Sequence, residues 1–81
     1  MITIILYTTA GCHLCELADV ILQDLSNKYK LRINYTEIGD DDVLVEHYGT
    51  TIPVVKFIDG SELLWPFSQQ DIESKIEQLQ T

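Results

Sequence analysis

Two cysteines separated by two residues lie where a strand-like segment gives way to a helix-like one. Residues 2–7 form a nearly unbroken run of mostly apolar, β-type side chains, typical of a strand buried on both faces. Cys12 and Cys15 follow after a short break that ends with Gly11. The chain has no other cysteine, which argues against a disulfide-stapled mini-domain, because such a domain needs more cysteines along its length. The pair therefore predicts a redox dithiol or half of a metal site.

The segment that begins at the first cysteine is expected to be a helix. Between residues 12 and 28 the apolar side chains recur at the spacing of an amphipathic helix: Leu14, Leu17, Ala18, Ile21, Leu22 and Leu25. At about 100° per residue the centre of this stripe falls near Leu14 and Leu25, which puts Cys15 closer to the core than Cys12. Unpaired N–H groups and the helix dipole stabilise a thiolate in the first turn. Cys12 is therefore the expected nucleophile and Cys15 the resolving thiol.

Patterns after this helix predict a second strand and a short second helix. Residues 31–38 alternate in polarity, as expected of a strand near a sheet edge. The first strand, the helix and this strand form a βαβ unit, so the two strands should be parallel. Residues 40–48 predict a short helix, because three aspartates at its start favour the positive end of the helix dipole.

The C-terminal part of the chain is expected to form a hairpin and a last helix. Residues 53–58 and 61–64 predict two strands joined by a two-residue turn, Asp59-Gly60. The last helix should begin with Ser68 as its N-cap. The resulting order, β-α-β-α-β-β-α, predicts a single α/β domain over residues 1–81, with a four-stranded mixed sheet flanked by helices.

The charge of the chain narrows the list of partners. Five Lys and Arg residues against thirteen Asp and Glu residues give a net charge of −8, which disfavours nucleic acids and anionic membranes. No apolar run approaches the roughly 20 residues of a membrane span, and no secretory signal precedes the first strand. We therefore expect a cytoplasmic, monomeric protein that binds neither nucleic acid nor membrane.

Residues near the cysteines leave the finer chemistry open. A protonated His13 would favour the Cys12 thiolate, whereas Glu16 and Asp19 would oppose it, and His13 could equally be an exposed residue with no essential role. Zinc prefers four ligands and the chain has no second cysteine pair, so we expect no resident metal. We also expect no resident organic cofactor.

Two segments resemble the glutaredoxin family. Residues 5–15, Ile-Leu-Tyr-Thr-Thr-Ala-Gly-Cys-His-Leu-Cys, resemble the opening of glutaredoxins, and residues 48–54, Tyr-Gly-Thr-Thr-Ile-Pro-Val, resemble that family's Thr-Val-Pro segment. The stretch Gly-Cys-His-Leu-Cys-Glu is similar to a small bacterial glutaredoxin-like family of largely unassigned role. The resemblance implies a thioredoxin-like, glutaredoxin-type fold in which Pro53 is a cis-proline facing the dithiol. Thr51 and Ile52 would then border a groove for a disulfide-bearing protein or for glutathione.

Departures from the glutaredoxin pattern bear on glutathione. Many glutaredoxins have Lys three residues before the first cysteine, where this chain has Thr9. After the hairpin the family usually has Gly-Gly and an acidic residue, where residues 65–68 are Trp-Pro-Phe-Ser. Between the cysteines, His13 and Leu14 stand where Pro and Tyr are frequent. Glutathione is thus a weaker candidate co-substrate. Trp65, at the end of an edge strand, is more typical of core or rim packing, but with Phe67 it could form an apolar patch beside the dithiol for a protein substrate.

The sequence and the resemblance together predict a thiol–disulfide oxidoreductase. Cys12 would attack a protein or glutathione disulfide, and Cys15 would resolve the mixed disulfide. Glutathione or a reductase would supply the electrons. Two alternatives stay open: a non-catalytic binding module of the same fold, and a carrier of a metal or iron–sulfur cluster shared between two chains.

Overall fold

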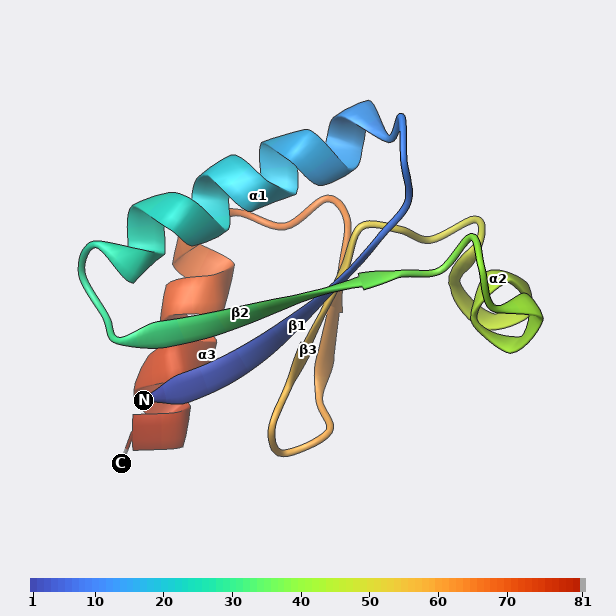
Figure 1. Ribbon diagram of the computed structural model, residues 1–81. Helices are drawn as coiled ribbons and strands as arrows, with labels where there is room; N and C mark the ends of the chain where they lie inside the picture. The colour runs from blue at the N-terminus through green and yellow to red at the C-terminus, as the bar shows by residue number, and fades with distance from the viewer. Residues whose placement is uncertain (81) are drawn as a thin grey trace.

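The computed structural model describes residues 1–80, which form a four-stranded sheet and three helices (Figure 1). In chain order the elements are β1 (Ile2–Thr8), α1 (His13–Ser26), β2 (Leu31–Glu37), α2 (Asp42–Tyr48), β3 (Val54–Phe57), β4 (Glu62–Leu64) and α3 (Gln69–Gln80). The predicted order of the elements is confirmed. No helix within residues 1–80 is long and apolar enough to cross a membrane.

The strands are arranged in the order β2-β1-β3-β4. β1 and β2 are parallel in register from Ile2 opposite Leu31 to Thr8 opposite Glu37, which confirms the βαβ unit. β3 is antiparallel to both β1 and β4, so the sheet is mixed as predicted. β2 lies at an edge, and its alternating polarity is the consequence of having one solvated face.

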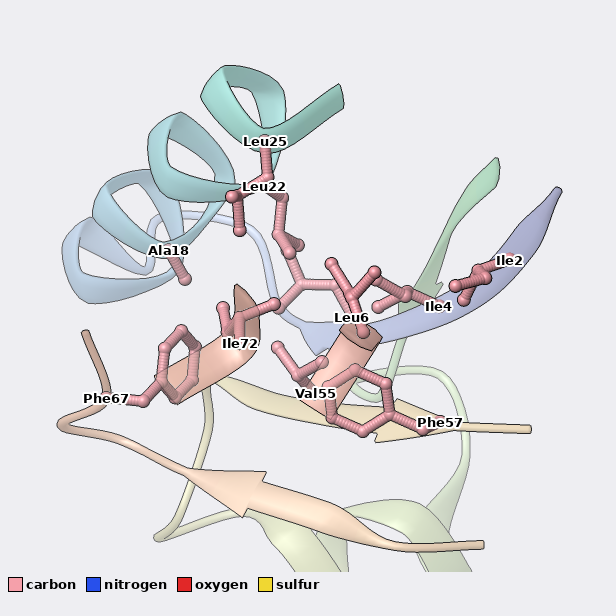
Figure 2. Close-up of a cluster of buried hydrophobic side chains, with 11 residues drawn as sticks. Ile2, Ile4, Leu6, Ala18, Leu22, Leu25, Val55, Phe57, Phe67 and Ile72 are labelled. Atoms are coloured by element: carbon pink, nitrogen blue, oxygen red, sulfur yellow. The ribbon is translucent and has the colours of Figure 1, made fainter. Parts of the chain in front are cut away.

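Helices α1 and α3 pack on one face of the sheet and enclose the main core. In Figure 2, Leu22 and Leu25 of α1 point toward the β1 side chains, while Ile72 of α3 lies beside Val55 of β3. The buried members of this cluster are Ile2, Ile4, Leu6, Ala18, Leu22, Leu25, Val55, Phe57, Phe67, Ile72 and Ile76. Burying one Leu or Ile side chain stabilises a fold by about 1.5–3 kcal/mol, so this face anchors β1, α1 and α3 to one another.

Helix α2 covers the other face near the carboxyl end of β1. There Tyr7, Ile38, Tyr48 and Val54 form a second buried cluster, and the Tyr7 and Tyr48 rings stack with centroids 4.3 Å apart. The Tyr48 hydroxyl donates to a Glu62 carboxylate oxygen at 2.5 Å, which ties α2 to β4. This hydrogen bond, together with burial, raises the pKa of the Tyr48 hydroxyl far above its ordinary value.

The predicted apolar stripe of α1 was wrong at its N-terminal end. Leu14 and Leu17 are 43% and 41% exposed, and the buried side chains are Cys15, Ala18, Leu22 and Leu25. Ala18 is the smallest of these and is completely buried. The buried face is therefore rotated away from Leu14 and toward Cys15.

The predicted two-residue hairpin turn was also wrong. The loop has three residues, Ile58–Gly60, because Phe57 N donates to Ser61 O at 2.9 Å and Gly60 N donates to Phe57 O at 3.0 Å. Gly60 has a φ of 89°, as a three-residue loop with a left-handed last residue requires. The Asp59 side chain accepts hydrogen bonds from the Ser61 backbone N–H and hydroxyl, which stabilises this longer loop.

The hairpin loop and the last helix are tied together by hydrogen bonds from side chains. Lys75 Nζ of α3 lies 2.7 Å from an Asp59 carboxylate oxygen, and the pKa of Asp59 is lowered mainly by this hydrogen bond. At the start of α3, Ser68 and Asp71 exchange hydrogen bonds of 2.9 and 3.1 Å in a capping box, so Ser68 is the N-cap as predicted.

Candidate functional site

A tight turn carries the chain from β1 into the cysteine pair. Cys12 N donates to Thr9 O at 3.2 Å, and Gly11 has a φ of 78°. A residue with a Cβ atom adopts this left-handed conformation only at a cost, so glycine is the residue that fits the turn. The turn connects the carboxyl end of β1 to the start of α1 (Figure 1), where Cys12 is the N-cap residue.

Cys12 is the N-cap of α1. Its backbone is extended, with φ −84° and ψ 104°, and its Sγ accepts a hydrogen bond from Cys15 N at 3.2 Å. The sulfur therefore occupies the place that a Ser or Asp oxygen takes in most helix caps. The same N–H group and the helix dipole favour a negative charge on this sulfur when the protein is reduced.

Cys12 and Cys15 are joined by a disulfide, with their Cα atoms 5.2 Å apart. Cys15 is 3% exposed, whereas Cys12 is only partly buried. The predicted difference in burial is thus confirmed. An incoming thiol or disulfide has access to the Cys12 side of the pair, while Cys15 lies on the buried face of α1.

A pocket of about 240 Å³ opens beside the disulfide and includes both cysteines. Its walls are the turn before Cys12, the first turns of α1 with Glu16 and Asp19, and Tyr35 of β2. The Tyr35 hydroxyl donates to Asp19 Oδ1 at 2.5 Å, which joins α1 to the edge strand. Partial burial, and secondly this hydrogen bond, raise the pKa of Tyr35.

Glu37 is a site residue that sequence reasoning missed. Its carboxylate accepts hydrogen bonds from Ala10 N at 3.0 Å and Gly39 N at 2.8 Å, and it bonds the Thr9 side chain. These bonds, the one from Thr9 foremost, lower the pKa of Glu37. A Cβ atom on Gly39 would lie 2.9 Å from the Glu37 carboxylate, so glycine permits this approach. Glu37 thereby anchors the turn before Cys12 to the end of β2.

No local sequence pattern could have identified this contact. Glu37 and Ala10 are 27 residues apart, and Glu37 by itself is an ordinary polar residue at a strand end. The register in which Thr8 faces Glu37 brings them together. The structure therefore supplies a supporting residue for the turn that the dithiol pattern alone does not indicate.

The proposed groove residues lie at the same end of the sheet as the disulfide but outside its pocket. The Ile52–Pro53 peptide bond is cis, as the resemblance implied, and Pro53 directly precedes Val54, which pairs with Tyr7 near the end of β1. Thr51 N, Thr51 Oγ1 and Ile52 N all donate to Tyr48 O, at 2.8, 3.1 and 3.1 Å. None of Thr51, Ile52 and Pro53 lines the 240 Å³ pocket, so their role in binding stays a prediction.

The other two predicted site residues, Trp65 and His13, do not line the pocket beside the disulfide either. Trp65 packs against the main core and meets Phe67 edge to face, with ring centroids 5.1 Å apart. The His13 side chain is 79% exposed, with Nδ1 3.5 Å from a Glu16 oxygen. Within residues 1–80 no group of three or more His, Cys, Asp or Glu side chains is arranged to hold a metal ion.

Comparison with known proteins identifies the family of this chain. Residues 3–77 match the family model described as Glutaredoxin-like domain (DUF836). The chain belongs to the glutaredoxin-like family. Among curated proteins there is no match.

Solved structures agree with the glutaredoxin-like assignment. A structural-genomics target protein from X. campestris superposes with a TM-score of 0.81 at 30% identity, over 91% of this chain and 95% of that one. Protein Ne2328 from Nitrosomonas europaea gives 0.79 at 24% identity, over 91% and 89%. Thioredoxin O2 from Arabidopsis thaliana, solved in the oxidized state, gives 0.70 at 25% identity, over 98% and 75%. The fold of this glutaredoxin-like protein is therefore thioredoxin-like, with a Cys-x-x-Cys pair at the start of α1.

Proposed function

We propose that this protein is a dithiol thiol–disulfide oxidoreductase in which Cys12 attacks and Cys15 resolves. The observation that carries the proposal is the position of Cys12. Its sulfur caps α1, accepts the Cys15 N–H and is more accessible than its partner. A thiolate there is stabilised and partly accessible, which is the combination that thiol–disulfide exchange requires.

The proposed reaction balances in two steps. The Cys12 thiolate attacks one sulfur of a substrate disulfide, so a mixed disulfide forms and the first substrate thiolate leaves. The Cys15 thiolate then attacks the Cys12 sulfur, the bond between Cys12 and the substrate breaks, and the second substrate thiolate leaves with the electron pair of that mixed disulfide. The product is the Cys12–Cys15 disulfide, which is the form of the protein described here.

The remaining expectations complete the proposal. The protein acts in the cytoplasm as a monomer, without a resident metal or organic cofactor, on a disulfide-bearing protein or on glutathione disulfide. Thr51, Ile52 and Pro53 border the substrate, and Trp65 provides apolar surface beside it. A reductase or glutathione regenerates the dithiol.

Thiol trapping with mass readout across a graded glutathione redox buffer tests the proposal. We expect a two-electron transition to the internal disulfide with a midpoint between about −180 and −270 mV. Cys12→Ser should abolish exchange, whereas Cys15→Ser should accumulate the mixed disulfide on Cys12. Retained dithiol turnover in Cys12→Ser, or two thiols that never form a bond to each other, would refute the assignment.

A further inference from the structure

The positive charges of this protein lie away from the disulfide. Arg32 pairs with Thr3 near the start of β1, and Lys56 pairs with Ile5 in its middle, whereas the disulfide follows the last residue of β1. At about 3.3 Å per residue, Lys56 lies roughly 10 Å before Thr8 along the sheet, which is about one Debye length at 0.1 M salt.

The other three cations lie at the opposite end of the sheet from the disulfide. Lys28 and Lys30 follow α1, and Lys30 O accepts a hydrogen bond from Ile2 N at the beginning of β1. Lys75 is bound to Asp59 in the hairpin loop, and Lys28 Nζ lies 3.0 Å from a Glu73 oxygen. In Figure 1 the two chain ends and the hairpin loop are in the lower part of the view, while the turn before α1 is at the upper right.

Acidic side chains, in contrast, lie on one side of the disulfide. Glu16 and Asp19 line the pocket that contains both cysteines, and no Lys or Arg lines it. Glu37 pairs with Thr8 and holds the adjoining turn. His13 follows Cys12 directly, and its exposed ring lies 3.5 Å from a Glu16 oxygen. The pocket beside the disulfide is thus open, acidic and without a compensating cation.

We propose that this pocket selects disulfides flanked by positive charge, so that the substrate is a basic polypeptide rather than glutathione. The inference rests on the proposed function and names its substrate class. A cleft lined by charge of one sign concentrates ligands of the other sign and increases their association rate by about 10- to 1,000-fold at low salt. Glutathione disulfide carries a net negative charge, so the same field repels it.

Three probes of different charge test this inference in single-turnover reactions of the reduced protein. Two are peptide disulfides with the same residues beside cysteine and either Lys or Glu at the same flanking positions, and the third is the neutral hydroxyethyl disulfide. Each rate constant is divided by that of the neutral reductant dithiothreitol with the same probe, because flanking charge also alters the reactivity of the disulfide itself. Ionic strength is varied from about 0.01 to about 1 M.

We expect the normalised rate for the Lys peptide to exceed that for the Glu peptide by about tenfold or more at low salt. The ratio should fall toward one at high salt, while the neutral probe should change little. Glu16→Gln should reduce the ratio by a few-fold. Asp24→Asn is the matched control, because it removes the same charge from the far end of α1, and it should leave the ratio unchanged.

The outcomes separate the inference from the function on which it rests. Equal normalised rates for the two peptides, or faster reaction with the Glu peptide or with glutathione disulfide, would overturn the charge selection while the neutral probe still reacted. If the neutral probe does not react with the reduced protein, the proposed function falls and the inference falls with it. A ratio that does not depend on salt also overturns the inference, because a field in solvent must be screened.

Discussion

A substitution at Gly11 tests the left-handed backbone of the turn before Cys12 without disturbing its packing. Its φ of 78° is left-handed, and a Cβ atom added there would meet nothing within 4 Å. Gly11→Ala therefore changes the backbone energy without a steric clash. The left-handed conformation costs a non-glycine residue about 1–2 kcal/mol, and the reduced freedom of the unfolded chain returns about 0.4–1 kcal/mol. We expect a net loss of about 1 kcal/mol, which lowers Tm by about 4–8 °C in a domain of this size.

Gly60 provides a matched control in the hairpin loop. Its φ is 89°, its Cβ position is equally open, and it lies far from the disulfide along the chain and the sheet. Gly60→Ala should therefore destabilise the protein as much as Gly11→Ala. The two variants should differ in chemistry, because relaxation of the Gly11 turn moves Cys12, whereas relaxation of the hairpin does not.

Two assays on the same samples separate the effect on stability from the effect on reactivity. Urea unfolding gives the loss of stability, and single-turnover reaction of the reduced protein with a neutral disulfide gives the rate. If the turn relaxes in the folded variant and its original geometry must be restored in the transition state at a cost of about 1 kcal/mol, Gly11→Ala slows the reaction about fivefold. Gly60→Ala should stay close to the wild-type rate. An unchanged stability in Gly11→Ala, or an equal loss of rate in both variants, would refute the reasoning.

Three other substitutions test the supports of the site and the core. Glu37→Gln should lower stability at neutral pH. Its difference from wild type should shrink as pH falls below 4.5, because the hydrogen bonds that lower the pKa of Glu37 favour the fold fully only while this carboxylate is ionised in the unfolded chain as well. Asp59→Asn should likewise lower stability, and its deficit should begin to shrink below pH 3.8, because Asp59 is then protonated in the unfolded chain while its pairing with Lys75 keeps it ionised in the fold. Urea unfolding at stepwise pH measures both effects. Ile72→Ala, at a fully buried position, should cost about 2–4 kcal/mol in thermal unfolding, and a loss under 1 kcal/mol would contradict the assigned core.

The sequence predicts the order of the elements because each one has a strong local pattern. The sharp change of period at Cys12 and the alternation in residues 31–38 depend on side chains that are close along the chain. Local patterns do not predict features that depend on tertiary contacts, such as the buried face of a helix or the length of a loop. The apolar stripe of α1 turned toward Cys15 because of how the helix meets the sheet, and the hairpin gained a loop residue because Asp59 bonds Ser61.

The cis peptide bond before Pro53 shows a second limit on what physical reasoning can predict from the sequence. Cis bonds make up about 5–6% of X-Pro bonds in folded proteins, so physical reasoning alone would have predicted trans. The family resemblance implied the cis form, and the structure has it. Resemblance thus carries information about a backbone conformation that neither period nor composition contains. It carried no information about Glu37, whose contact with Ala10 depends on the register of β1 and β2.

The cap at Cys12 decides which variant isolates the chemistry. The sulfur accepts the Cys15 N–H, so it satisfies one of the backbone donors that the first turn of α1 leaves without a partner. Cys12→Ala would remove both the thiol and the cap, and loss of a cap by itself costs about 1 kcal/mol. Serine retains an acceptor at the same place and is among the best N-cap residues. A loss of exchange in Cys12→Ser with an unchanged helix therefore reports on the thiol, whereas the same loss in Cys12→Ala would confound reactivity with the stability of the helix start.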